Sequence, residues 1–249
     1  MKVFTQEEYD AIGRDEYGVK RLPQGDYSLV VFRCNYNELG DYNELGDYNE
    51  LGNYNKLGNG NKLGDYNELG DYNELGNGNK LSNYNELGNY NELGNYNKLG
   101  DYNELGDYNE LGNYNKLGDC NELGNGNKLD DYNKLGDYNE LGDYNELGRW
   151  CEFGQFFIHG KNTTFEGGVV KNGTFVKVGR IGSEMRDAYF FIDENGKFFV
   201  RAGCWFSDMD RFIERVKAVH GGTRFERQYL AACEYAKAVL PEMLEEINE

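Results

Sequence analysis

Leucine recurs at every sixth position from Leu39 to Leu147, and an asparagine lies two residues before each leucine. The repeating unit is Asp/Asn-Tyr-Asn-Glu/Lys-Leu-Gly, and 19 copies run without insertion or deletion over residues 35–148. A strict period of six is too short for helical repeats. It predicts a mainly β protein whose short strands stack coil on coil into a solenoid.

A longer period lies within the first. Lysine replaces the glutamate of the unit seven times, and five of these lysines fall 18 residues apart: Lys62, Lys80, Lys98, Lys116 and Lys134. Three hexapeptides therefore make one coil. This is the geometry of a three-sided β-helix, in which coils stack at the strand spacing of about 4.8 Å.

Leu-Gly pairs such as Leu45-Gly46, Leu51-Gly52 and Leu141-Gly142 resemble the signature of hexapeptide-repeat β-helix proteins, which are usually left-handed. That family has a small residue where this chain has Asn49 or Asn139. Many members are trimeric acyltransferases with a catalytic histidine and a cofactor groove between subunits. This chain lacks the irregular coils that build such a site, so we expect no enzymatic activity and no cofactor.

Variation among the copies indicates which side chains face inward. Leucine and the unit's central asparagine never vary, whereas the tyrosine is replaced by glycine or cysteine at Gly60, Gly78, Cys120 and Gly126. Deleting an inward aromatic side chain would cost about 3–5 kcal/mol, so a tyrosine slot that tolerates glycine and cysteine is predicted to face solvent. Strand alternation agrees, and predicts leucine and asparagine ladders inside and tyrosine ladders outside. We expect glycine and Asp/Asn at the corners, where positive φ is needed.

The net charge of −18 is concentrated in the repeat. One column of hexapeptides has five aspartates, six glutamates and no lysine, giving a predicted face of −11, while the lysine column is +2. The candidate partner-binding carboxylates are Asp47, Glu50, Asp65, Glu68, Glu86, Asp101, Glu104, Asp119, Glu122, Asp137 and Glu140. The candidate aromatic contacts beside them are Tyr48, Tyr66, Tyr84, Tyr102 and Tyr138.

A stiff acidic rod suggests nucleic-acid mimicry, because proteins that bind phosphates present Lys and Arg. In architecture and charge the chain resembles the pentapeptide-repeat DNA mimics that occupy the DNA site of gyrase, and more loosely the anti-restriction and anti-CRISPR decoys of phages. The resemblance implies an inhibitor whose partner is a nucleic-acid-binding protein, without direct contact to nucleic acid. Two alternatives remain open. The charge serves only solubility, or the rod is a structural adaptor that binds a protein or glycan through its tyrosine ladders.

The flanking sequences differ from the repeat. Residues 1–34 are interpreted as an N-terminal cap, with a short helix capped by Thr5 and a strand over residues 27–33. Aromatic variants of the hexapeptide continue to Gly160 and predict a closing coil. The expected domains are therefore the cap, a solenoid over residues 35–160 and a small α+β domain over residues 161–249.

In the C-terminal domain, residues 188–192 and 197–201 flank Asp193-Glu-Asn-Gly196 and predict a β-hairpin. A helix capped by Ser207 is expected to about Val219. A second is expected from Thr223 to the terminus, kinked or interrupted at Pro241. An apolar stripe on this second helix either packs within its own domain or forms a homodimer interface: Phe225, Tyr229, Ala232, Tyr235 and Val239.

The residue types used in catalysis and metal binding are sparse. The two histidines, His159 and His220, are expected to be structural, and the five cysteines show no metal-binding spacing. The scattered cysteines suit a reducing compartment. With no secretory signal and no apolar run of membrane length, the sequence predicts a cytoplasmic protein that does not contact membranes.

Overall fold

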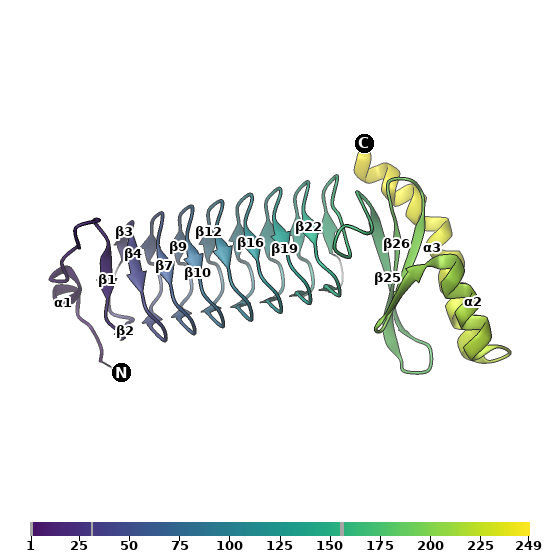
Figure 1. Cartoon of the computed structure of the whole chain (residues 1–249), viewed down its shortest axis with the longest axis horizontal. Coiled ribbons are helices and arrows are strands. Elements are labelled where there is room, and N and C mark those ends of the chain that lie inside the picture. The colour runs from purple at the N-terminus through teal and green to yellow at the C-terminus, as the bar shows by residue number, and fades with distance from the viewer. Residues whose placement is uncertain (1, 31, 155–156) are drawn as a thin grey trace. The chain divides into compact units, whose positions relative to one another are not determined.

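The computed structural model describes residues 2–30, 32–154 and 157–249. It divides the chain into two compact units, Met1–Gly160 and Lys161–Glu249. The first unit is a solenoid of stacked parallel coils, and the second is a small antiparallel sheet with helices (Figure 1). The expected mainly β fold with a C-terminal α+β region is confirmed.

The solenoid has three sides, each an eight-stranded parallel sheet. The mixed side consists of β1 (Lys20–Leu22), β4 (Asn37–Leu39), β7 (Lys56–Leu57), β10 (Glu74–Leu75), β13 (Glu92–Leu93), β16 (Glu110–Leu111), β19 (Lys128–Leu129) and β22 (Glu146–Leu147). The lysine side consists of β2 (Asp26–Tyr27), β5 (Glu44–Leu45), β8 (Lys62–Leu63), β11 (Lys80–Leu81), β14 (Lys98–Leu99), β17 (Lys116–Leu117), β20 (Lys134–Leu135) and β23 (Glu152–Phe153). The glutamate side consists of β3 (Arg33–Cys34), β6 (Glu50–Leu51), β9 (Glu68–Leu69), β12 (Glu86–Leu87), β15 (Glu104–Leu105), β18 (Glu122–Leu123), β21 (Glu140–Leu141) and β24 (Ile158–His159).

Strands of successive coils pair in parallel with an offset of 18 residues. Glu86 lies opposite Glu104, for example, and Leu87 lies opposite Leu105. The same offset joins Lys80 to Lys98 on the lysine side. Three hexapeptides per coil, predicted from the lysine period, is therefore confirmed.

The interior consists of leucine and asparagine ladders, as predicted. The repeat leucines are 0–4 % exposed and the repeat asparagines of the central slot 0–1 %. Asn109 Oδ1 accepts a hydrogen bond from the Asn91 backbone N–H of the preceding coil at 2.7 Å, and Asn91 Nδ2 donates to Gly88 O at 2.9 Å. Among the described residues, one buried side-chain polar atom, Asn61 Nδ2, has no partner.

The prediction for the corners is wrong in detail. Within the repeat, positive φ falls on the tyrosine slot, with values of 56–62° for the tyrosines and 65–67° for Gly60, Gly78 and Gly126. The glycine after each leucine serves sterically instead. A Cβ atom at Gly106 would overlap Asn89 Oδ1 and come within 3.0 Å of the Gly88 backbone. The corner side chain of the preceding coil occupies that space.

The N-terminal region differs from the expectation. Thr5 does cap a helix, α1 (Gln6–Asp10), but the strand expected over residues 27–33 is wrong. Asp26 Oδ1 accepts from the Ser28 N–H at 2.9 Å, which turns the chain so that β2 and β3 join different sheets. Together with β1 they form a coil upstream of the repeat. At the other end, Phe153 and His159 occupy leucine slots opposite Leu135 and Leu141.

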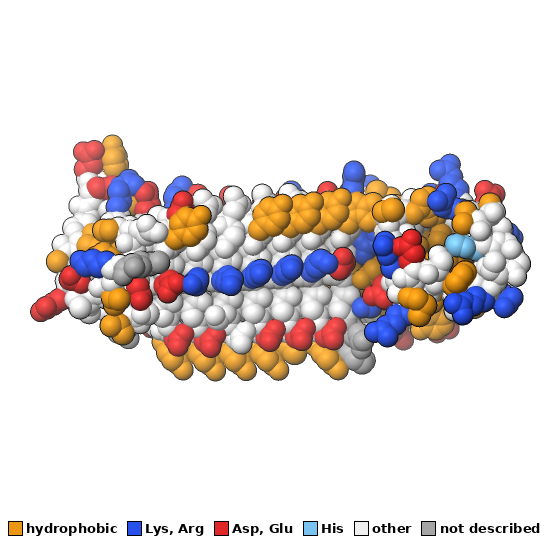
Figure 2. Space-filling view, turned by 90° about the horizontal axis from the view of Figure 1, so that it is seen from below, with side chains coloured by type: hydrophobic (Ala, Val, Ile, Leu, Met, Phe, Trp, Pro, Cys, Tyr) orange, Lys and Arg blue, Asp and Glu red, His pale blue; other side chains and the backbone are white. Residues whose placement is uncertain are grey.

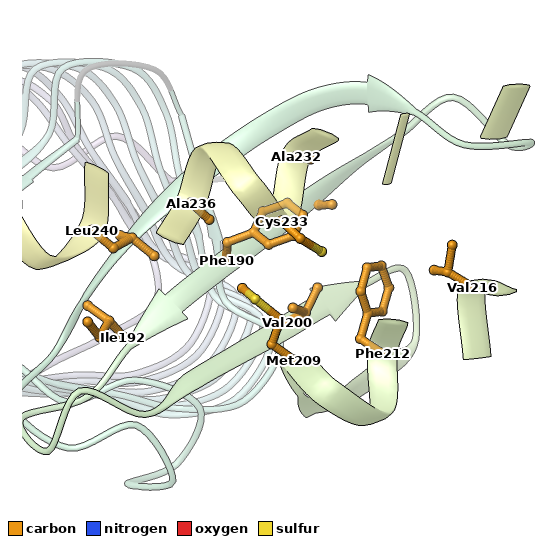
Figure 3. Packing of buried hydrophobic residues seen from close by; sticks show 11 residues of the cluster. Phe190, Ile192, Val200, Met209, Phe212, Val216, Ala232, Cys233, Ala236 and Leu240 are labelled. Atoms are coloured by element: carbon orange, nitrogen blue, oxygen red, sulfur yellow. The ribbon is translucent and has the colours of Figure 1, made fainter. Parts of the chain in front are cut away.

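The second unit is a four-stranded antiparallel sheet of β25 (Thr174–Ile181), β26 (Arg186–Ile192), β27 (Phe198–Ala202) and β28 (Trp205–Asp208), followed by α2 (Met209–His220) and α3 (Arg224–Asn248). The predicted hairpin is β26–β27. Asp208 rather than Ser207 caps α2, and α3 continues through Pro241 without interruption. Side chains of the sheet and both helices form one core, seen in Figure 3: Phe190, Ile192, Val200, Met209, Phe212, Val216, Ala232, Cys233, Ala236 and Leu240.

The steric function of the repeat glycine can be tested by Gly106→Ala. The added methyl group would displace the Asn89 side chain and the neighbouring backbone, so we expect a loss of about 1–3 kcal/mol in the free energy of unfolding. Gly40→Ala is the matched control, because a Cβ atom at Gly40 would have no heavy atom within 4 Å. Denaturant unfolding measures both, and equal stability of the two variants would refute the steric explanation.

His159 gives a pH-dependent prediction. Burial lowers the pKa of its imidazole below the ordinary 6.5, while the unfolded chain keeps the ordinary value. The unfolded state therefore binds the proton first, and stability is lost as the pH falls below about 6.5. We expect His159→Leu, which restores the residue of the slot, to show a smaller fall in melting temperature between pH 7 and pH 5 than the wild type. A parallel fall in both proteins would contradict this.

Candidate protein-binding surfaces of the solenoid

The glutamate side has an uninterrupted ladder of six exposed glutamates, one per coil and in register: Glu50, Glu68, Glu86, Glu104, Glu122 and Glu140. Strand spacing separates successive members by about 4.8 Å. Two unit charges at this separation repel by about 0.9 kcal/mol even in water. The ladder therefore opposes folding and concentrates negative potential on one side.

A groove of about 980 Å³ runs along this ladder. It is lined by the six glutamates and the Leu-Gly pairs that follow them, such as Leu87-Gly88 and Leu105-Gly106. No lysine or arginine is among the described residues that line it. A row of cations can therefore approach the carboxylates along the whole groove.

The structure regroups the aspartates. A Cβ atom at Gly64, on the lysine side, would overlap Asp47 Oδ1, and Gly118 and Gly136 bear the same relation to Asp101 and Asp119. The expectation that these corner aspartates share one face with the glutamates is therefore wrong. Each corner side chain leans toward the preceding side and accepts a backbone hydrogen bond from the next coil, at 2.7 Å from Asp65 N to Asp47 Oδ1.

A different set of aspartates lies on the glutamate side. Asp71, Asp107 and Asp143 lie against Gly88, Gly124 and Gly160 of that side. The sequence contained the signal, since corner residues follow the glycine of the side toward which they lean. Six glutamates and three aspartates over six coils, about 29 Å, give one charge per roughly 3.2 Å. One strand of B-DNA has about one charge per 3.4 Å.

The other two sides are partly neutralised. The row of five lysines on the lysine side has a glutamate at each end. Glu44 pairs with Lys62 at 2.6 Å, and Glu152 pairs with Lys134 at 2.8 Å. Figure 2 shows this row of basic side chains with a parallel row of acidic ones. On the mixed side, Lys56 pairs with Glu74 at 2.8 Å. The glutamate side is thus the most strongly charged surface among the described residues of the repeat.

Tyrosine ladders follow the corners, as predicted. Tyr48, Tyr66, Tyr84 and Tyr102 stack with ring centroids 4.9–5.1 Å apart and planes within 6° of parallel. This ladder is at the corner between the lysine and glutamate sides, and Cys120 separates it from Tyr138. Because stacked rings cover one another's faces, each inner ring presents its edge and hydroxyl outward. Desolvation, adjacent Tyr84 and Tyr48, and Asp65 together raise the pKa of Tyr66.

The candidate dimerisation residues are in different environments. Ala232 is 6 % exposed within the core of its own unit, and Tyr229 packs edge-on against Phe212 with centroids 5.4 Å apart. Phe225 contacts the ring of His220 at 5.9 Å, and Val239 is half-buried. Tyr235 is exposed. Most of the stripe is therefore engaged within the second unit.

No model of a known protein family, no curated protein and no solved structure matches the chain. Among the described residues, no group of three or more His, Cys, Asp or Glu side chains is arranged to hold a metal ion. No helix in the described part of the chain combines the length and apolar character needed to cross a membrane.

The electrostatic cost of the ladder leads to a prediction. In Glu86→Gln/Glu104→Gln, neutral amides interrupt the like-charge contacts, so we expect the melting temperature to rise by about 2–4 °C at low ionic strength. The gain should shrink in 1 M salt, which screens exposed charges. Glu74→Gln is the control, because it removes the partner of Lys56 and should not stabilise. A gain that persists in high salt would contradict an electrostatic origin.

Proposed function

We propose that the protein is a non-enzymatic inhibitor that mimics nucleic acid. Its glutamate side would occupy the DNA- or RNA-binding groove of a host or defence enzyme. The observation that supports this most directly is the ladder of six in-register glutamates along a groove with no basic lining residue among those described. The partner is a protein with a row of Lys or Arg, so this function requires neither a cofactor nor contact with nucleic acid.

The spacing of the carboxylates supports this function. At one charge per roughly 3.2 Å, the glutamate side resembles one phosphate strand rather than a whole duplex, whose two strands together have one charge per about 1.7 Å. A protein groove that follows one strand would find carboxylates at a similar pitch. Arginine can pair with a carboxylate through two parallel hydrogen bonds, as it does with phosphate.

The like-charge stacking is a second argument. On the mixed side the same fold pairs Lys56 with Glu74, so the repeat can accommodate opposite charges in neighbouring coils. On the glutamate side no two coils of the repeat do so, and the one opposite-charge register is between Arg33, upstream of the repeat, and Glu50. A surface that only had to be soluble could have alternated its charges. We infer that the repulsion is retained because a basic partner relieves it on binding.

We further propose that the coils are of the left-handed hexapeptide type and that the protein is functionally similar to pentapeptide-repeat DNA mimics, anti-restriction proteins and anti-CRISPR proteins. Such targets would place it in the cytoplasm, where it would form a homodimer through the exposed part of α3. Architecture and charge support this comparison, and the pentapeptide motif itself is absent from the sequence.

A structural or adaptor rod is the second candidate. The observation that favours it is the exposure of the tyrosine edges and hydroxyls in long, regular rows, which provide hydrogen-bonding and aromatic contacts for a protein or glycan. Contacts of this kind depend little on salt, whereas binding through many carboxylates weakens steeply with ionic strength. Salt therefore discriminates between the two functions.

The test is a pull-down from lysate at low and high salt with a variant in which the six ladder glutamates are changed to glutamine: Glu50, Glu68, Glu86, Glu104, Glu122 and Glu140. Mimicry predicts capture of a nucleic-acid-binding enzyme by the wild type, loss of capture by the variant, and elution of the enzyme by salt. Purified target would then be inhibited by the wild type and not by the variant.

The control has the same net charge and changes six glutamates elsewhere on the solenoid to glutamine: Glu38, Glu44, Glu74, Glu92, Glu110 and Glu146. It should capture the enzyme as the wild type does. Equal loss in both variants would show that only net charge matters, and retention in both would favour the tyrosine ladders.

A further inference from the structure

The aromatic row at the corner between the mixed and lysine sides has a gap two residues long. Tyr42 is followed by Gly60 and Gly78 in the next two coils, and the row resumes at Tyr96. Figure 2 shows this interruption in one row of hydrophobic side chains, next to the row of basic side chains. At about 4.8 Å per coil, the gap spans two ring positions of the row.

The gap exposes a ring face that the ladder covers elsewhere. Tyr96 stacks on Tyr114 at 5.1 Å on one side only, and it is 61 % exposed. Tyr114 and Tyr132, further along the row, are 44 % and 42 % exposed. A planar group can therefore stack on Tyr96 from the open side, whereas inner rings offer only their edges.

The two glycines are not equivalent. A Cβ atom at Gly60 would lie 2.7 Å from the Tyr42 ring, while one at Gly78 would have no heavy atom within 4 Å. In the neighbouring aromatic row, the single gap at Gly126 is partly filled, because Tyr108 lies 2.7 Å from the Cβ position there. Of the three described glycines in the tyrosine slot, Gly78 is therefore the one with an open ring position.

The charges around the gap favour an anion. Lys80 and Lys98 follow Gly78 and Tyr96 by two residues, so they lie beside the open position. Neither is in an ion pair with a described residue, whereas Lys62 is paired with Glu44. The corner residues of this row are neutral across the gap, Asn59, Asn77 and Asn95, where the other corners include aspartates.

We propose that the open position at Gly78 is a binding site for a nucleotide, whose planar base stacks on Tyr96 and whose phosphate binds Lys80 and Lys98. A ring and a phosphate in one small molecule match the two features that the gap combines. The site is on a different corner from the glutamate groove, so it is independent of the proposed mimicry.

The experiment is isothermal titration with AMP as the probe, at low ionic strength, using the full chain. Gly78→Tyr fills the open position with the residue most units have there, and it should lower AMP affinity by at least about tenfold. Gly126→Tyr makes the same change in the row where the gap is already partly filled, and it should leave the affinity unchanged. Thermal melting verifies that both variants fold.

Two further comparisons make the proposal falsifiable. Lys80→Gln should weaken AMP binding, and adenosine or inorganic phosphate alone should bind more weakly than AMP. The proposal is overturned if the wild type gives no binding heat with millimolar AMP, if Gly78→Tyr binds as the wild type does, or if Gly126→Tyr loses binding equally. Phosphate binding as tightly as AMP would also overturn it, because the ring would then contribute nothing.

Discussion

The solenoid depends on one interaction, the hydrogen bond from the backbone of one coil to the buried asparagine of the next. Backbone bonds between coils use the N–H groups of the tyrosine, glutamate or lysine, and glycine slots, such as Tyr90, Glu92 and Gly94, but not the N–H of the central asparagine. Asn Oδ1 accepts the N–H of the asparagine 18 residues earlier, and where Nδ2 donates to the glycine carbonyl at its own corner, one amide joins corner and core. A shift of register would break this contact in every coil.

This constraint turns a short sequence repeat into long rows of identical groups. Because every coil has the same rise, a residue type that recurs every 18 positions becomes a straight ladder on one side. Glutamate then repels glutamate, lysine repels lysine, and tyrosine stacks on tyrosine. The buried ladders must supply the stability that the charged ladders oppose. The surface can therefore be specialised without altering the core.

The core was predictable because strand alternation and the invariance of leucine and asparagine depend only on sequence. The corners were not, because their geometry depends on which residue adopts positive φ and on which side the next side chain leans. Asp47 was assigned to the glutamate side by its hexapeptide, yet it packs against Gly64 of the lysine side. The N-terminal coil was missed for a related reason: an Asp26 turn divides one apolar run between two sheets.

Positive φ at tyrosine explains why the aromatic rows can contain gaps. A left-handed conformation costs a non-glycine residue about 1–2 kcal/mol, and stacking of aromatic pairs returns about 0.5–1.5 kcal/mol. Glycine at the same place avoids the strain and forgoes the stacking, so the exchange is nearly neutral for folding. The core therefore does not dictate where gaps fall. A gap beside lysines and neutral corners, as at Gly78, is free to be set by binding rather than by stability.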